Sequence, residues 1–140
     1  VYRLKAERPD LTIAINGGIT DLDQAERHLA LTDGVMLGRA AYQNPYLLSV
    51  VDNRLFGGEV SGLTRWQVAS VMADYADRML RDRDVRVGNI AKHMVGLFQG
   101  MPGARAFRRH LSENAFMAGA TGQVIRDAAA LVPNVTAVAA

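Results

Sequence analysis

The chain has 140 residues, a formal net charge of +2 and 49% hydrophobic residues, which excludes a disordered tail and suffices for a core. It contains no cysteine, which excludes disulfides, thiolate metal ligands and a cysteine nucleophile within these residues, and we expect a cytoplasmic protein. Because no apolar run approaches the roughly 18–20 residues that span a bilayer, no membrane partner is expected. The first five residues resemble the middle of an amphipathic helix, so the chain is expected to be a fragment.

The first third of the chain shows a strand–helix–strand pattern. Residues 11–15 are β-branched and apolar, which is typical of a strand buried on both faces of a parallel sheet. Residues 21–31 predict a helix with Leu22 and Ala25 on one face, and residues 35–37 predict a second short buried strand. Such a unit favours parallel pairing with a right-handed crossover. The pattern fits a (β/α) barrel or a doubly wound sheet equally well.

Each of these strands is followed by a glycine turn. Asn16, Gly17 and Gly18 follow the first strand, and Gly38 with Arg39 follows the second. Because adjacent parallel strands end at the same edge of a sheet, both turns are expected to direct backbone N–H groups at one anion, such as a phosphate. Arg39 adds a cation whose planar guanidinium fits a phosphate. The alternatives are two turns without a ligand, and an Asn16 amide that only caps its turn.

The alternation of strands and helices ends at about Asn53, and a glycine-rich connection follows over residues 56–62. We therefore expect domains at 1–52 and 53–140. Thr64 and Gln67 form a capping box that starts a helix running to about Arg81. Further helices are predicted over residues 87–98, 104–115 and 123–131, followed by a weak strand signal at 135–138. Together the helices predict a small antiparallel bundle. Apolar residues recur at helical spacing at Val68, Val71, Met72, Tyr75 and Met79, then at Ile90, Met94 and Leu97, and then at Phe107 and Leu111.

Basic side chains are concentrated over residues 78–110, where eight arginines and lysines stand against two aspartates. Such a block in a nearly neutral chain favours a polyanionic partner. Part of it lies in a predicted loop with the two aspartates, and we expect this part to pair locally and stay solvated. Its members are Arg81, Arg83 and Arg86, with Asp82 and Asp84.

The rest of the basic block predicts an RNA-binding face. Three- and four-residue spacing places Arg105, Arg108 and Arg109 on the side of their helix opposite its apolar residues. Lys92 and His93 lie on the preceding helix. Cations on adjacent helices suit the phosphates of a folded RNA. A solvated helix face is the alternative, and for His93 structural packing is an equal one.

Two blocks of the sequence resemble the tRNA-dihydrouridine synthases. The first comprises NGGI at residues 16–19 and DGVMLGRAAYQNP at residues 33–45. The second comprises KHMVGLFQG at residues 92–100 and PGARAFRRHLSE at residues 102–113. The second block is similar to the helical domain of one subfamily, the A type, which acts on uridines 20 and 20a of the tRNA D-loop. The resemblance covers about residues 1–131.

This resemblance implies an α/β fold in which the C-terminal β/α units of an FMN-binding TIM barrel are followed by an all-α helical bundle domain that binds tRNA. In that family NADPH reduces the flavin, a hydride passes to C6 of the uracil and a cysteine supplies the proton at C5. The residues that it assigns to FMN are Asn16, Gly17 and Gly18, with Gly38 and Arg39 at the phosphate. Those that we expect to contact tRNA are Arg105, Arg108, Arg109, Lys92 and His93.

No catalytic residue is expected within these 140 residues, because the cysteine of the family would lie upstream of Val1. The chain alone is therefore expected to be inactive, and the intact enzyme to be a monomer. No metal is expected, since the histidines are isolated and no HExxH or His/carboxylate cluster is present. Two other functions remain open, a non-catalytic RNA-binding module and a different FMN-dependent barrel oxidoreductase.

Overall fold

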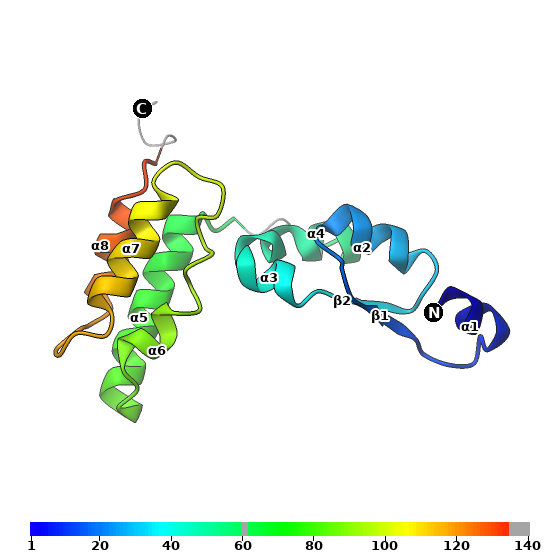
Figure 1. The fold of residues 1–140 in the computed structure, drawn as a ribbon, viewed down its shortest axis with the longest axis horizontal. Coiled ribbons are helices and arrows are strands. Elements are labelled where there is room, and N and C mark those ends of the chain that lie inside the picture. The colour runs from blue at the N-terminus through cyan, green and yellow to red at the C-terminus, as the bar shows by residue number, and fades with distance from the viewer. Residues whose placement is uncertain (60–61, 135–140) are drawn as a thin grey trace. The chain divides into compact units, whose positions relative to one another are not determined.

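The computed structural model describes residues 1–59 and 62–134 and divides into two compact units, Val1–Ser61 and Gly62–Ala140 (Figure 1). The division falls in the glycine-rich stretch. The weak strand signal at residues 135–138 lies outside the described residues.

The first unit contains a two-stranded parallel sheet and several short helices. Strands β1 and β2 pair in parallel with Ile15 opposite Val35, and α2 connects them, which confirms the predicted strand–helix–strand pattern (Figure 1). The elements in chain order are α1 (Tyr2–Glu7), β1 (Ala14–Asn16), α2 (Leu22–Leu29), β2 (Gly34–Met36), α3 (Arg39–Gln43), the 3-10 helix η1 (Pro45–Val50) and α4 (Val51–Phe56).

The strands are shorter and more exposed than predicted. Strand β1 has three residues instead of the five expected over residues 11–15, and Leu11 keeps 38% of its surface exposed. Met36 in β2 is 50% exposed, so the prediction of strands buried on both faces is wrong for this structure. The reason is that α2 packs against the sheet with Leu22 and Ala25 buried, while the described residues of this unit provide no second layer.

Two helices of the first unit are joined by one arginine. Arg54 of α4 donates to Asp23 Oδ1 at 2.6 Å and to Glu26 Oε1 at 2.8 Å, and both acceptors lie on α2. Asp23, in the first turn of α2, also interacts favourably with the helix dipole. The two ion pairs fix α4, which follows the second glycine turn in the chain after α3 and η1.

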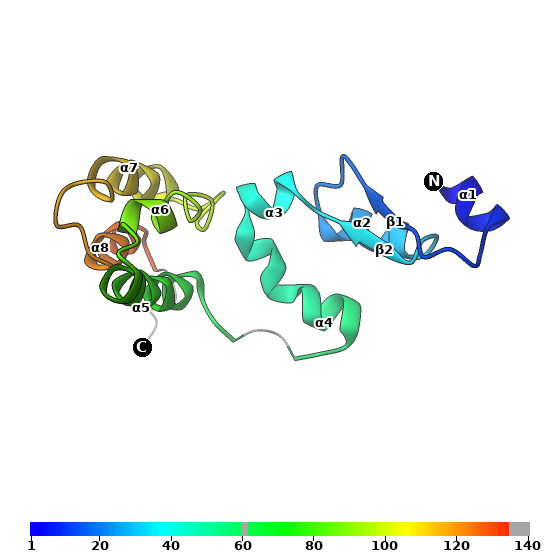
Figure 2. The same ribbon diagram turned by 90° about the horizontal axis from the view of Figure 1, so that it is seen from below.

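The second unit consists, in its described residues, of helices and turns. Helix α8 lies between α5 and α7, as the view along these helices shows (Figure 2), and the chain runs in opposite directions in α7 and α8 (Figure 1). The capping box of Thr64 and Gln67 is present at the start of α5, as predicted. The helices are α5 (Arg65–Arg83), α6 (Val87–Ala91), α7 (Ala104–Asn114) and α8 (Gln123–Ala130).

The helix predicted over residues 87–98 ends at Ala91, and tight turns follow. Their backbone hydrogen bonds join residues three apart, as from Leu97 N–H to Met94 O at 2.9 Å. Ala91, Met94 and Leu97 are all buried, and they recur every three residues. This period matches the 3.0 residues of a tight 3-10 turn better than the 3.6 of an α-helix. The inward position predicted for Met94 and Leu97 is confirmed although their helix is absent.

An aromatic cluster fills one end of the second unit. The Trp66 ring lies edge-on to Phe98 at 5.3 Å between centroids, and Phe98 lies edge-on to Phe107 at 4.8 Å. Phe98 and Phe107 are fully buried, and Trp66 Nε1 donates to Val132 O at 3.2 Å. Edge-on pairs of this kind add to the stabilisation that burial itself provides. The cluster therefore joins α5, the turns after α6, α7 and the end of the described chain.

Helix α5 packs through alanine rather than through its larger residues. Its buried residues are Ala69, Ala73 and Ala76, whereas Val71 and Tyr75 are exposed and therefore lie outside its packing face. The small side chains let α8 approach the α5 backbone closely. A Cβ added at Gly122, just before α8, would lie 2.2 Å from Ala73 O.

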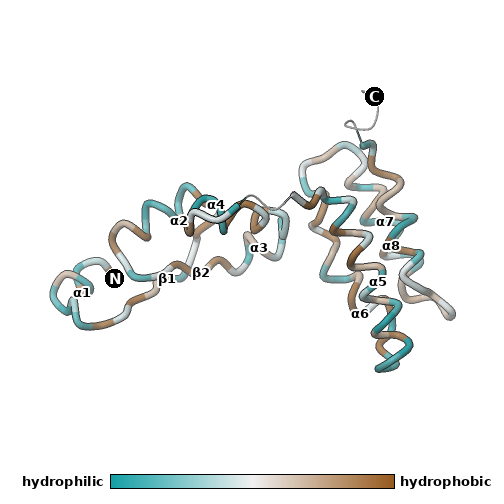
Figure 3. Tube along the Cα trace, turned by 180° about the vertical axis from the view of Figure 1, so that it is seen from behind, coloured by the Kyte–Doolittle hydropathy of each residue, from teal (hydrophilic) through white to brown (hydrophobic). Residues whose placement is uncertain are grey.

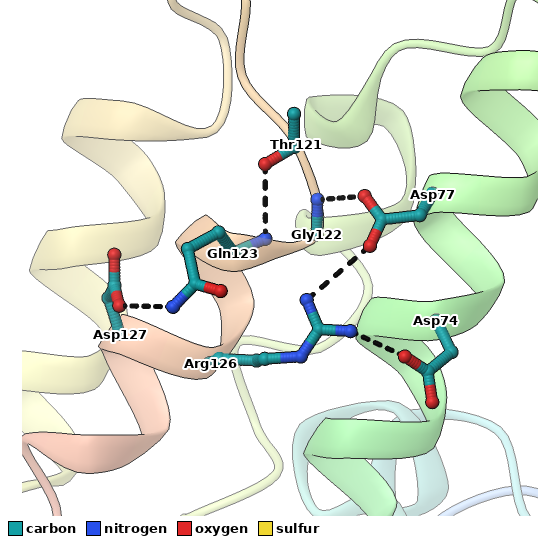
Figure 4. Close-up of polar contacts among 7 residues, drawn as sticks. All are labelled: Asp74, Asp77, Thr121, Gly122, Gln123, Arg126 and Asp127. Carbon is teal, nitrogen blue, oxygen red and sulfur yellow. Dashed lines mark hydrogen bonds and ion pairs between the residues drawn. The ribbon is translucent and has the colours of Figure 1, made fainter.

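The N-terminus of α8 is capped from α5. Its N-cap residue Gly122 has no side chain, and its N–H donates to Asp77 Oδ1 at 2.6 Å (Figure 4). Arg126 of α8 reaches the other oxygen of Asp77 at 3.4 Å and also pairs with Asp74. A carboxylate at this end of a helix also interacts favourably with the helix dipole. One aspartate thus replaces the cap that glycine cannot provide.

None of the described helices is both long and apolar enough to cross a membrane. Hydrophilic and hydrophobic residues alternate along α5, α7 and α8 (Figure 3).

We predict that Gly122→Ala destabilises the second unit by about 2 kcal/mol or more, since the added methyl group overlaps a backbone oxygen of α5. Urea unfolding followed by fluorescence of Trp66, the single tryptophan, measures this. Gly62→Ala is the matched control, because a Cβ there meets nothing within 4 Å, and it should stay within about 0.5 kcal/mol of the parent. Equal effects of the two substitutions would contradict the close approach of α5 and α8.

Candidate functional site

The two glycine turns lie next to each other at one edge of the sheet. The register pairs Asn16, the last residue of β1, with Met36, the last residue of β2. Gly17 and Gly18 follow the first strand, and Gly38 follows the second by two residues. The juxtaposition predicted from the sequence is therefore present in the structure.

The first turn requires glycine for its backbone conformation. Gly17 has a φ of +119° and Gly18 a φ of +72°, a region that residues with a side chain rarely adopt. A Cβ at either position would meet nothing within 4 Å, so the turn is open on the side where side chains would project. Open backbone of this kind can approach a ligand closely, and its N–H groups can bind an anion.

The end of the first turn is fixed by the start of α2. Asp21 caps this helix by accepting from Gln24 N–H at 2.8 Å, which lowers the pKa of the Asp21 carboxyl. The Gln24 amide in turn donates to Thr20 Oγ1 at 2.7 Å. The N-terminus of α2 thus already holds a carboxylate. An anion at this edge would therefore use the N–H groups of the turn rather than those of the helix.

The second turn presents a cation. Gly38 is the N-cap of α3 and makes no side-chain cap, and Arg39 is the first residue of the helix. Arg39 is exposed and forms no ion pair with any described residue. The Asn16 side chain, also exposed, forms no hydrogen bond to its own turn within the described part of the chain, which removes the capping alternative for this residue.

Asp33 fixes the register of the two strands. Its N–H donates to Ile13 O at 3.0 Å, and its Oδ2 accepts from Ile13 N–H at 2.8 Å. Lys5 Nζ lies 2.8 Å from the same oxygen. The Ile13 N–H and then Lys5 lower the pKa of the Asp33 carboxyl. This residue therefore links the segment before β1 to the segment before β2, and with it the positions of the two turns.

Other polar features of the first unit lie away from the turns. A hollow of about 650 Å³ between α1 and the end of α2 is lined by Tyr2, Lys5, Leu29 and Leu31 and includes neither glycine turn. Asn44 Oδ1, at the C-terminal end of α3, is buried without a hydrogen-bond partner among the described residues. A buried oxygen without a donor costs about 1–3 kcal/mol, so the end of α3 is suited to receive a donor from elsewhere.

In the second unit, four of the five predicted basic residues are exposed, and Arg108 is half-buried. Arg105 and Arg109 are exposed on α7, on the side opposite the buried Phe107 and Leu111, as predicted. Arg108 lies 3.4 Å from Gln99 Oε1, through Nη1. We call the set of Arg105, Arg108, Arg109, Lys92 and His93 the basic face.

The turns after α6 hold the other members of the basic face. Lys92 and His93 are exposed at the start of these turns, and α6 and α7 are in contact. Arg65 of α5 donates to Leu97 O, and the buried Leu97 anchors the same turns in the core. Cationic side chains on a supported backbone can bind successive phosphates of a folded RNA.

Two other kinds of site find no support. The described residues contain no group of three histidine or carboxylate side chains that could hold a metal ion. Ser112 donates its hydroxyl to Arg108 O at 2.9 Å and has no base beside it, so it is not arranged as a nucleophile. The described residues thus place two glycine turns and Arg39 at one edge of the sheet in the first unit, and the basic face in the second.

Comparison with known proteins decides the family. The family model described as dihydrouridine synthase (Dus) matches residues 1–133. The chain belongs to the dihydrouridine synthase family. Its relatives include the "tRNA-dihydrouridine(20/20a) synthase" of Vibrio cholerae, which is 49% identical over 132 residues, covering 94% of this chain and 40% of that protein.

Proteins of the same name occur among its relatives in other bacteria. That of Shewanella oneidensis is 51% identical over 126 residues, covering 90% of this chain and 37% of the relative. That of Escherichia coli K12 is 48% identical over 132 residues, covering 94% of this chain and 38% of the relative. The chain therefore spans about 40% of the length of the curated relatives that it matches.

The structure also shows two residues near the glycine turns that the sequence analysis did not identify. Neither Asp33 nor Arg54 was singled out from the sequence, because their partners Ile13 and α2 are distant along the chain. The turn position of Asp33 predicts at most a bond to backbone close by in sequence, not the observed bond to Ile13. Arg54 carries no local signal either.

We predict that the Asp33 carboxyl titrates below the ordinary aspartate pKa of about 3.9. Its folded pKa is lowered, so its stabilisation of the first unit is present above that ordinary value and is lost as the pH falls through the lowered one. Carboxyl carbon NMR of Asp33 measures the midpoint, and Lys5→Gln should move it upward. A midpoint at or above the ordinary value would contradict the contacts with Ile13 and Lys5.

Proposed function

We propose that the chain is the C-terminal part of a cytoplasmic, monomeric tRNA-dihydrouridine synthase that reduces uridines 20 and 20a of the D-loop. In this proposal the first unit belongs to an FMN-binding TIM barrel, and the second is a helical bundle that binds tRNA. The family match over residues 1–133 and the names of the relatives support it. The single observation that carries the proposal is that the family's first sequence block brings two glycine turns and Arg39 to one edge of the sheet, while its second block exposes Arg105, Arg109 and Lys92.

The residues of the first unit fit the phosphate end of FMN. The open turn at Gly17 and Gly18 offers backbone N–H groups, and Arg39 offers an uncommitted guanidinium. Asn16 and the first turn would orient the cofactor, while Gly38 and Arg39 would hold its phosphate. When bound, FMN supplies hydride transfer between NADPH and C6 of the uracil. The residues described here hold it in place and carry no acid that would protonate C5, so the chain alone is expected to be inactive.

The basic face fits the sugar–phosphate backbone of tRNA. Arg105 and Arg109 are one helical turn apart on α7, and Arg108 is held near Gln99. Contacts of this kind give affinity and position the RNA, but they read little sequence. The second unit would thus place the D-loop, while selection of the uridine depends on the reacting site.

We predict that Arg105→Ala/Arg108→Ala weakens binding of the chain to tRNA about tenfold or more. Two lost phosphate contacts should also reduce the slope of log affinity against log salt by about 1.5. A fluorescence-anisotropy titration of labelled tRNA across a range of salt concentrations measures both quantities.

A matched control removes the same charge elsewhere. Arg3→Ala/Arg8→Ala takes two arginines from the α1 region, where each pairs with a neighbouring acid, and should leave affinity nearly unchanged. Equal effects of the two double variants would mean that net charge, not the basic face, binds tRNA. Absence of tRNA affinity in the parent chain would contradict the assignment of tRNA binding to the basic face. Salt-sensitive tRNA affinity with no flavin binding would favour an RNA-binding module.

A further inference from the structure

A second hollow lies in the helical unit, away from the basic face. It measures about 370 Å³, within the range of small-ligand sites, and lies where the end of α5, the start of α6 and the connection from α7 to α8 meet. Its side chains are mainly apolar with one cation and one acid. They are Leu80, Asp84, Arg86, Val87, Phe116 and Met117.

The Phe116 ring is held in a fixed place but remains open to solvent. It packs directly on the backbone of Gly88, where an added Cβ would lie 2.5 Å from the ring. Yet Phe116 is 58% exposed, and its neighbour Met117 is 65% exposed. A ring supported on one side and open on the other is a platform for stacking, and thioethers make favourable contacts with aromatic rings.

One cation lies beside this platform. Arg86 lines the hollow, is exposed and forms no ion pair with any residue that the structure describes. Asp84 also lines the hollow but does not pair with Arg86, so the guanidinium of Arg86 is available to an anionic ligand. Arg83, at the end of α5, is likewise exposed and unpaired within the described residues but does not line the hollow.

This combination matches one kind of ligand. An unpaired nucleotide has a flat aromatic base, which stacks on an exposed ring, and a phosphate, which pairs with arginine. A purely apolar partner would leave Arg86 without a counter-charge, and a free anion would leave Phe116 and Met117 uncovered. We propose that this hollow binds an unpaired nucleotide of an RNA chain, with the base against Phe116 and Met117 and a phosphate at Arg86.

The proposal rests on the proposed function, because it takes tRNA to be the source of the nucleotide. It also goes beyond the expectation that Arg86 is merely solvated. The basic face would bind helical RNA through phosphates, whereas the hollow would select an unstacked base. Stacking is tolerant of base identity, so the hollow would distinguish unpaired from paired RNA rather than one sequence from another.

The test uses the full 140-residue chain with its methionine methyl groups labelled for NMR. The probes are a single-stranded RNA hexamer, a fully paired RNA duplex and inorganic phosphate. The Met117 methyl signal, assigned from Met117→Leu, should move upfield with the hexamer through the ring current of a stacked base. Phosphate and duplex should move it little.

Substitution then tests the platform itself. Phe116→Leu keeps the apolar volume but removes the ring, and should weaken hexamer binding about fivefold or more, which is the lower range for loss of one stacked base. Arg86→Gln should reduce the salt dependence of hexamer binding. Tyr75→Leu is the matched control, because this exposed ring of α5 does not line the hollow, and it should leave hexamer affinity unchanged.

The outcomes separate this proposal from the proposed function. If tRNA binds through the basic face but the Met117 signal does not move when the hexamer is added, the proposed nucleotide site is contradicted and the proposed function stands. If neither RNA binds, both are wrong. A Met117 signal that shifts with protein concentration in the absence of RNA would assign the hollow to contact with another protein and overturn the proposal.

Discussion

The second unit depends on how closely α8 approaches α5. Gly122 lies against the carbonyl of Ala73, at a distance that leaves no room for a side chain. This approach removes the residue type that would normally cap α8, and Asp77 of α5 provides the cap instead. Because α7 packs on α8, the position of the basic face depends on the same contact. A few small residues and one carboxylate therefore determine where the arginines of α7 lie.

The first unit depends on a different constraint, the register of two three-residue strands. Asp33 sets this register through the backbone of Ile13, and the register places the turns after β1 and β2 at one edge. Glycine at positions 17 and 18 then opens the backbone toward that edge. The arrangement of the two turns thus needs only three paired residues in each strand. Leu11 before β1 and Met36 in β2 remain exposed in this unit.

Sequence reasoning was most successful where the determinants are local. The capping box at Thr64, the ends of α7 and α8 and the face of Arg105 and Arg109 all depend on residues within a few positions of one another. The parallel pairing of β1 with β2 joins residues twenty positions apart, and it could be predicted because a short strand–helix–strand unit favours that pairing. The family itself was also identified from contiguous blocks of sequence. These features could be predicted because spacing and turn chemistry decide them.

Most of the features that could not be predicted from the sequence depend on contacts between residues distant along the chain. The alanine face of α5 could not be inferred from hydrophobicity, since larger residues such as Val71 have a stronger apolar signal, and only the approach of Gly122 explains it. The end of α6 at Ala91 was missed because Ile90, Met94 and Leu97 keep helical spacing and are all buried, although the backbone after Ala91 forms tighter turns. The bond from Gly122 to Asp77 joins residues 45 positions apart, and the ion pairs of Arg54 join residues 28 and 31 positions apart, beyond the reach of local patterns.

The central claim is that these residues form the flavin-phosphate and tRNA-binding parts of a dihydrouridine synthase. The most direct test replaces the matched 132-residue segment of the Vibrio cholerae relative with this chain and measures dihydrouridine by mass spectrometry in tRNA from cells without the enzyme. We expect dihydrouridine at positions 20 and 20a of this tRNA, and we expect it to be lost when Arg39→Ala removes the proposed phosphate contact. A folded, flavin-loaded chimaera that leaves both uridines unmodified would contradict it.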